Sequence, residues 1–154
     1  MIKVKKLIPD AIIPQRGRSG DACYDLYTSE EVFLRESEGK VLAPTGIALE
    51  LPVNYEAEIR PRSGISLKGL EVKRLSDDVP ENVDVDVIQG TIDSNYRGEI
   101  NIIIRYSSFY QTYIPKGTKL AQMKINYVPD TELIEVEELS DSNRGTKGFG
   151  SSGV

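Results

Sequence analysis

The side chains that could do chemistry in this chain are carboxylates, cations and hydroxyls, because it contains no histidine and only one cysteine, Cys23. The absence of histidine excludes histidine general bases and nearly all zinc chemistry. A single thiol excludes an internal disulfide and is typical of a reducing compartment. Any catalysis must therefore use Asp or Glu, Lys or Arg, hydroxyls, backbone amides and a weakly held hard cation.

One segment has the composition of an anion site. Arg62, Ser63 and Gly64 follow a run that alternates like a strand. Arg62 could supply charge and Ser63 a hydroxyl, while the amides of Ser63 and Gly64 could point at a phosphate. The alternative is an ordinary turn at a strand end, in which Gly64 supplies an unusual backbone angle.

A second segment, Gly90 to Ile100, contains the turn formers Asp93, Ser94 and Asn95 and is predicted to be a hairpin corner. Such a corner could also aim the Asp93 carboxylate at a water poised to attack phosphorus. The Tyr96 ring could pack on a sugar, and backbone groups of the hairpin could pair with a base edge.

The last twelve residues, 143–154, combine four glycines with two adjacent serines, Arg144 and a single aromatic residue, Phe149. One interpretation is a disordered terminus. The other is a flap, in which Arg144 clamps a phosphate and Phe149 stacks on a base. Glycine amides and serine hydroxyls could then wrap phosphate oxygens. The residues that would do so are Gly148, Gly150, Ser151 and Ser152.

Two more polar side chains sit at strand boundaries. Asp25 lies near the start of a strand, and Gln122 follows the turn Lys116–Thr118 as a candidate phosphate or water ligand. Taken alone, each is explained better by a purely structural role than by a functional one.

The elements that must position these residues are strands. Val83, Val85 and Val87 alternate with acidic residues, and similar period-two patterns cover 55–60 and 121–127. The near-continuous apolar run 100–104 predicts a strand covered on both sides. At most one helical turn is expected, at 66–70. We therefore predict a single all-β domain over 1–142, with 70–82 as a charged loop or protruding hairpin and 143–154 as a flexible tail.

Together and in this order, the five segments resemble the five motifs of the trimeric dUTP diphosphatase (dUTPase) family. The motifs read Asp21-Ala22-Cys23-Tyr24-Asp25-Leu26, Pro61-Arg62-Ser63-Gly64, Gly90-Thr91-Ile92-Asp93-Ser94-Asn95-Tyr96-Arg97-Gly98, Gly117-Thr118-Lys119-Leu120-Ala121-Gln122 and the tail from Arg144 to Gly153. The resemblance implies a distorted jelly-roll (a β-clip sandwich) and a homotrimer with three sites at subunit junctions. It also implies a C-terminal arm exchanged between subunits, and hydrolysis of dUTP to dUMP and diphosphate with Mg²⁺.

The resemblance also implies residue roles. Asp93 would be the general base for in-line attack of water on the α-phosphorus. Arg62, Ser63, Gly64, Gln122 and Arg144 would hold the triphosphate. Asp25 would reach the magnesium ion through water. Gly90, Thr91 and Ile92 would read uracil through their backbone groups, and Tyr96 would lie under the deoxyribose.

Two features depart from the family pattern. Cys23 stands where glycine is expected, and a positive φ there would cost roughly 1 kcal/mol. The interval from Arg62 to Asp93 is long, and its extra stretch 70–82 could be a surface decoration, an arm that binds a regulatory protein partner, or an additional wall of the site. A nucleotide-sensing regulator of the same fold, as proposed for some phage-borne relatives, is therefore one rival. A dCTP deaminase is less favoured, because deaminases place a glutamate base in a different hairpin.

The net charge of −5 argues against nucleic-acid or anionic-membrane partners. The chain also lacks an apolar stretch of about 20 residues and a signal-peptide pattern at its start. We therefore expect a cytoplasmic protein.

Overall fold

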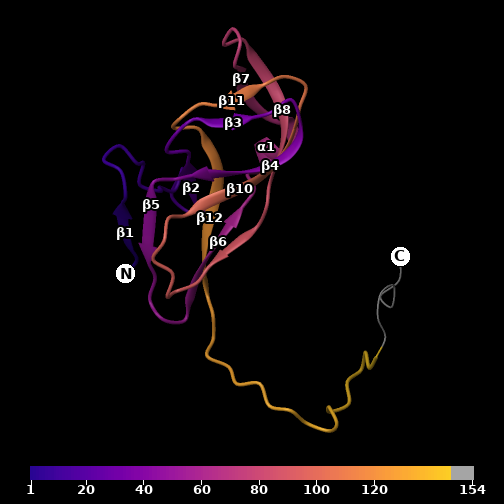
Figure 1. Cartoon of the computed structure of the whole chain (residues 1–154). Coiled ribbons are helices and arrows are strands. Elements are labelled where there is room, and N and C mark those ends of the chain that lie inside the picture. Colours follow the sequence, from indigo (N-terminus) through magenta and orange to yellow (C-terminus); the bar gives the residue numbers. More distant parts are fainter. Residues whose placement is uncertain (147–154) are drawn as a thin grey trace.

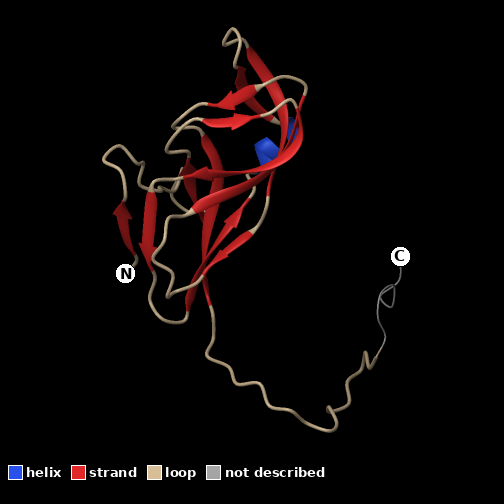
Figure 2. Cartoon of the chain, in the orientation of Figure 1, coloured by secondary structure: helices blue, strands red, loops and turns tan. Residues whose placement is uncertain are grey.

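The computed structural model describes residues 1–146, and the regular secondary structure within this range is almost entirely strand, joined by loops (Figure 2). The prediction of an all-β fold is confirmed. The strands are β1 (Lys3–Lys6), β2 (Cys23–Tyr27), β3 (Val32–Leu34), β4 (Ser37–Pro44), β5 (Ile47–Glu50), β6 (Tyr55–Arg60), β7 (Leu70–Arg74), β8 (Pro80–Val87), β9 (Gly90–Ile92), β10 (Asn101–Ser108), β11 (Thr112–Ile114) and β12 (Lys119–Tyr127). The described part has one helix, α1 (Ser63–Lys68).

The strands form three antiparallel sheets. The largest has the order β3-β11-β7-β8-β10-β4, and its two edge strands β3 and β4 come close together, so the sheet curls toward a barrel. A four-stranded sheet has the order β2-β12-β6-β9, and β1 pairs with β5 alone. Every motif singled out above, apart from the tail, lies on the four-stranded sheet or directly follows one of its strands.

The apolar core follows the period-two patterns of the sequence. On β8, Val83, Val85 and Val87 are buried while the residues between them are not. On β10, Ile102 and Ile104 are buried, but Ile103 faces outward and is 38% exposed. Within the described part of this one chain the outward side of the 100–104 strand is thus only partly covered at Ile103, and cover from another subunit stays a prediction.

Residues 70–82 pair as the two arms of a hairpin, β7 with β8, in the register Leu70↔Val83. The tip at 75–79 projects at one end of the molecule (Figure 1). Leu70 and Val72 are buried, so the base of the hairpin belongs to the core. The charged composition of the segment did not predict this contribution.

Helix α1 begins at Ser63, three residues before the single turn that was expected, and it ends at Gly69 with φ 77°. With its ψ of −176° this is a conformation that essentially only glycine adopts. Space also demands glycine, because a Cβ at position 69 would come within 2.8 Å of the backbone oxygen of Val83.

After β12 the chain leaves the body as an extended segment, 128–146, without helix or strand (Figure 1). Its apolar side chains Leu133, Ile134 and Leu139 are largely exposed. Within residues 1–146, no helix has the length and apolar character needed to cross a bilayer.

Candidate active site

Three of the predicted site residues meet at one end of the four-stranded sheet. Asp25 on β2 and Gln122 on β12 face each other in the register of the strands, and Gln122 in turn faces Arg60 on β6. Directly opposed residues of antiparallel strands share a face, so Asp25 and Gln122 lie on the same side of the sheet. Gln122 Nε2 donates to the carbonyl of Pro61 at 2.7 Å, which ties β12 to the segment that precedes Arg62.

Asp25 holds two cations at this end. Lys119 Nζ lies 2.8 Å from Asp25 Oδ2, and Arg62 Nε lies 3.7 Å from Asp25 Oδ1. The hydrogen bond from Lys119 to Asp25 raises the pKa of the lysine above its ordinary value. Arg62 Nη1 also donates to the carbonyl of Lys119 at 2.9 Å, which fixes the direction of the guanidinium. The result is a small cationic group held by one carboxylate.

The backbone beside these cations can bind an anion. Arg62 is the N-cap of α1, so the amides of Ser63 and Gly64 belong to its first turn and have no acceptor within the helix. A Cβ added at Gly64 would meet nothing within 4 Å. The surface over Gly64 is therefore open, and a phosphate could approach the backbone closely.

Asp93 lies directly after β9, in a turn closed by a hydrogen bond from Tyr96 N to Asp93 O at 3.1 Å. Its side chain is exposed and lines an open cleft of about 460 Å³ together with Tyr55 and Glu56. No ion pair to Asp93 occurs among residues 1–146. The carboxylate is thus accessible to water and to a ligand.

Tyr96 is oriented by its own hairpin. Its hydroxyl donates to the carbonyl of Glu99 at 3.0 Å, and its ring lies against Gly98, where a Cβ would come 2.3 Å from the tyrosine Oη. Arg97 Nη1 donates to the carbonyls of Ser94 and Tyr96 at 2.7 and 2.9 Å, which braces the turn. About half of the Tyr96 side chain stays exposed, so one face of the ring is available to a ligand.

The catalytic candidate and the cationic group are far apart within one chain. β6 and β9 are antiparallel, with Ile59↔Gly90 and Ala57↔Ile92, so Asp93 follows beside Glu56 while Arg62 leaves the other end. The path from Glu56 to Arg62 covers six residues, roughly 20 Å in extended chain. The structure therefore brings Asp25, Arg62 and Gln122 together, and it separates them from Asp93, Tyr96 and the strand Gly90–Ile92.

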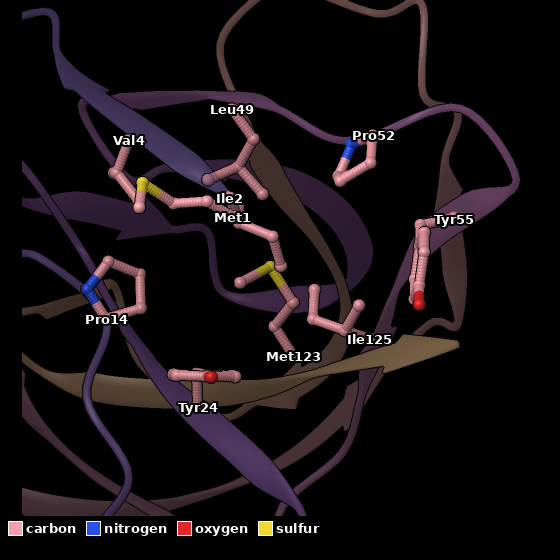
Figure 3. A pocket seen from close by; sticks show the side chains of 10 residues that line it. All are labelled: Met1, Ile2, Val4, Pro14, Tyr24, Leu49, Pro52, Tyr55, Met123 and Ile125. Atoms are coloured by element: carbon pink, nitrogen blue, oxygen red, sulfur yellow. The ribbon is translucent and has the colours of Figure 1, made fainter. Parts of the chain in front are cut away.

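An apolar cavity of about 430 Å³ opens on the other side of the four-stranded sheet (Figure 3). Met1 and Val4 of the N-terminal segment, Tyr24, Met123 and Ile125 point into it from different elements. No charged side chain lines it. The cavity suits apolar side chains rather than a triphosphate, so it is not part of the candidate active site.

The predicted site residues of the C-terminal tail lie partly outside the described residues. Arg144 lies in the extended segment beyond β12, whereas the predicted site residues Gly148, Phe149, Gly150, Ser151 and Ser152 lie outside the described residues.

Cys23 is not among the residues with positive φ, so the strain considered for it does not arise. Lys119 was missed as a site residue, although it stands in the same motif as Gln122, because its contact with Asp25 depends on strand register.

Within residues 1–146, no cluster of three or more acidic or Cys side chains could hold a metal ion by itself. Asp25 is a single carboxylate already paired with two cations. A hard cation at this place would need ligands from a bound phosphate and from water, which agrees with an indirect contact to Asp25.

A family model described as dUTPase matches residues 9–153. The chain is 45% identical to a deoxyuridine 5'-triphosphate nucleotidohydrolase of Clostridioides difficile, in an alignment that covers 99% of this chain and 97% of the relative.

Two solved structures extend the similarity to the fold. The dUTPase of Staphylococcus bacteriophage 80alpha with dUPNHPP superposes with a TM-score of 0.84 at 29% identity, covering 100% of this chain and 99% of the other. The D95N dUTPase from phage phi11 of S. aureus, described for its coordination of a structural Mg(II) ion, superposes with a TM-score of 0.74 at 25% identity, covering 90% and 97%.

Proposed function

The chain belongs to the dUTPase family, and from that premise we propose that its active site is completed between subunits, with Asp93 of one acting on a triphosphate held by another. Hydrolysis of dUTP is its activity, as in the nucleotidohydrolases to which it is similar. The separation of Asp93 from Arg62 along the β6–β9 pair carries this proposal. A span of roughly 20 Å is too long for a base and a phosphate-binding group acting on one reacting phosphorus.

Asp93 deprotonates a water molecule as that water attacks the α-phosphorus of dUTP. The Pα–O bond to the β-phosphate breaks, diphosphate leaves, and the water oxygen ends on dUMP. The accessible carboxylate in an open cleft supports this role, since a general base must reach its proton within one hydrogen bond.

The end of the four-stranded sheet opposite Asp93 binds the triphosphate. Arg62, Gln122 and the amides of Ser63 and Gly64 converge there, with Lys119 held beside them by Asp25. Such groups stabilise negative charge that grows on the diphosphate leaving group during in-line displacement. Arg144 and the tail residues Gly148, Phe149, Gly150, Ser151 and Ser152 then close over the nucleotide.

Asp25 would hold a magnesium ion through water when the ion arrives with the triphosphate. When bound, the ion neutralises phosphate charge, while Asp25 keeps Arg62 and Lys119 in place. The absence of a protein-only metal cluster among residues 1–146 is consistent with an ion that keeps most of its own water.

Uracil is read by backbone groups of Gly90, Thr91 and Ile92, and deoxyribose packs on the Tyr96 ring. A site built from fixed polar backbone groups rejects a base that leaves them unpaired. The constrained ring of Tyr96 leaves no room for a 2′-hydroxyl.

A homotrimer with exchanged C-terminal arms provides the partner subunit. The extended segment 128–146 carries exposed apolar side chains alternating with glutamates, as at Ile134-Glu135-Val136-Glu137. Among residues 1–146, β1 pairs only with β5 and no described strand covers its outer edge; it carries Lys3, Lys5 and Lys6 beside the apolar cavity. An acidic, apolar arm from a neighbour would complement that edge in charge and could fill the cavity.

A substrate panel tests the activity. Release of diphosphate from dUTP, dTTP, dCTP and UTP is measured with magnesium, in water enriched in ¹⁸O. We expect dUTP to be turned over far faster than the other three nucleotides, and the ¹⁸O from water to appear in dUMP and not in diphosphate. Binding of dUTP without turnover would instead support a nucleotide-sensing regulator, and release of ammonia from dCTP would support a deaminase.

A further inference from the structure

Glu58 is a buried carboxylate on a strand position that the alternating pattern assigns to solvent. It lies on β6 between the polar residues Glu56 and Arg60, yet it is only 6% exposed. All of the groups that contact its oxygens are hydrogen-bond donors, so each oxygen acts only as an acceptor.

The donors come from three different segments. Arg60 Nε donates to Oε2 at 2.6 Å, and Asn126 Nδ2 of β12 reaches the same oxygen at 3.3 Å. The side-chain amide of Gln89 donates to Oε1. The Arg60 guanidinium hydrogen-bonded to Glu58 keeps the pKa of that carboxyl below its ordinary value, so the group is a charged acceptor at neutral pH.

Each of these segments continues into a part of the candidate site. Arg60 immediately precedes Pro61 and Arg62, Gln89 immediately precedes Gly90, and Asn126 lies on the same strand as Gln122. The strand Gly90–Ile92 is short and forms the edge of its sheet, pairing only with β6. Its position therefore depends on few ladder hydrogen bonds, and the Glu58–Gln89 contact is an additional link to β6.

We propose that Glu58 is a positioning residue for nucleotide selection, which holds Gln89 and thereby sets where the backbone of Gly90–Ile92 meets the base. This inference rests on the proposed function, because it assigns base reading to that strand. A buried and fully satisfied polar network is rigid, and a charged acceptor strengthens its hydrogen bonds. Loss of the link lets the edge strand shift, and small displacements of a reading group are costly to specificity.

The test exchanges the carboxylate of Glu58 and the amide of Gln89 between the two positions. Glu58→Gln places an amide donor among the donors of Arg60, Gln89 and Asn126. Gln89→Ala removes the hydrogen bond to Glu58 with little change to the fold. The double variant E58Q/Q89E again pairs one donor with one acceptor and leaves the total charge unchanged. The readouts are kcat/KM for dUTP and for dCTP, and the thermal midpoint Tm. Glu71→Gln on the exposed side of β7 is the matched control.

We expect Glu58→Gln and Gln89→Ala to reduce the preference for dUTP over dCTP about tenfold. The exchanged pair should recover to within about threefold of the wild type, and Glu71→Gln should change nothing. A wild-type preference in both single variants, with Tm unchanged, would overturn the role of Glu58 while leaving dUTP hydrolysis intact. If Glu58→Gln does not fold, Gln89→Ala decides alone. Failure of the wild type to turn over dUTP would instead overturn the proposed function.

Discussion

Asp93 and Arg62 leave opposite ends of the same antiparallel strand pair, β9 with β6. One chain therefore carries the proposed base at one end and the proposed phosphate-binding group at the other, roughly 20 Å apart along extended backbone. Each end is locally complete: Asp93 and Tyr96 share a braced turn, and Arg62 is oriented by Lys119 and Asp25. The proposed homotrimer would bring these two ends together, because a closed ring places one end of each copy beside the other end of its neighbour.

The contact between Gly98 and Tyr96 predicts a defect for a single methyl group. Gly98→Ala places a Cβ within 2.3 Å of the Tyr96 hydroxyl, so the ring must move away from its place under the sugar. We expect kcat/KM for dUTP to fall about 10- to 100-fold and the discrimination against UTP to weaken. Tyr96→Phe, which keeps the ring and loses only its hydrogen bond to Glu99, should have the smaller effect. Equal activity of Gly98→Ala and wild type would show that the ring position is unimportant.

The position of Asp25 leads to a prediction about how activity depends on the magnesium concentration. Asp25→Asn removes the charge that holds Lys119 and Arg62, and it weakens any water-mediated contact to the ion. The magnesium concentration for half-maximal activity should rise by about tenfold or more, as is usual for groups beyond the direct ligands. Asp10→Asn, which breaks the surface pair with Lys116, should leave the magnesium dependence unchanged. The same rise in both variants would argue for a general charge effect.

The period-two patterns of the sequence predicted the strands better than they predicted the contacts between side chains. Val83, Val85 and Val87 gave β8 directly, because period two assigns each side chain to a face. Helix α1 was placed three residues late, since six residues are too few for helical periodicity to show. The burial of Glu58 could not be predicted, because its cover comes from Gln89 and Asn126, which are distant in sequence.

The candidate site was also predictable only in part. Segment composition identified Asp25, Arg62 and Gln122, and strand pairing brings these three together. The distance from Asp93 to Arg62 is a property of topology: it follows from the antiparallel order of β6 and β9, which no local pattern encodes. The pairing of Lys119 with Asp25 depends on the register of β12 against β2, which also contains a bulge near Lys119.

The tail is predicted to act only after folding. Deletion of residues 143–154 should reduce dUTP turnover to background while Tm stays within a few degrees of the full-length value, because no described strand includes these residues. Phe149→Leu tests the stacking role separately and should raise KM more than it lowers kcat. Full turnover by the truncated chain would contradict the flap.

Tyr113 provides a prediction for alkaline pH. Its hydroxyl donates to Asp78 at 2.6 Å, and this hydrogen bond to a carboxylate raises the pKa of Tyr113 to about 12. Because the folded-state pKa exceeds the unfolded value of about 10, the stabilisation is fully present below pH 10 and is lost as the pH rises through about 12. Ultraviolet titration of the wild type minus Tyr113→Phe should show one tyrosine ionising near pH 12. In Asp78→Asn this step should move toward 10; an unmoved step would contradict the assignment.

Mixing subunits with complementary defects tests most directly whether Asp93 works on phosphates held by another chain. Asp93→Asn and Arg62→Gln each remove one half of every site in their own homotrimers, so both proteins should be inactive alone. Co-assembled in equal amounts, they should regain about a quarter of the wild-type dUTP turnover, because about one site in four then pairs an intact Asp93 with an intact Arg62 from a neighbour. Mixed assemblies that form but remain as inactive as their parents would contradict a site shared between subunits.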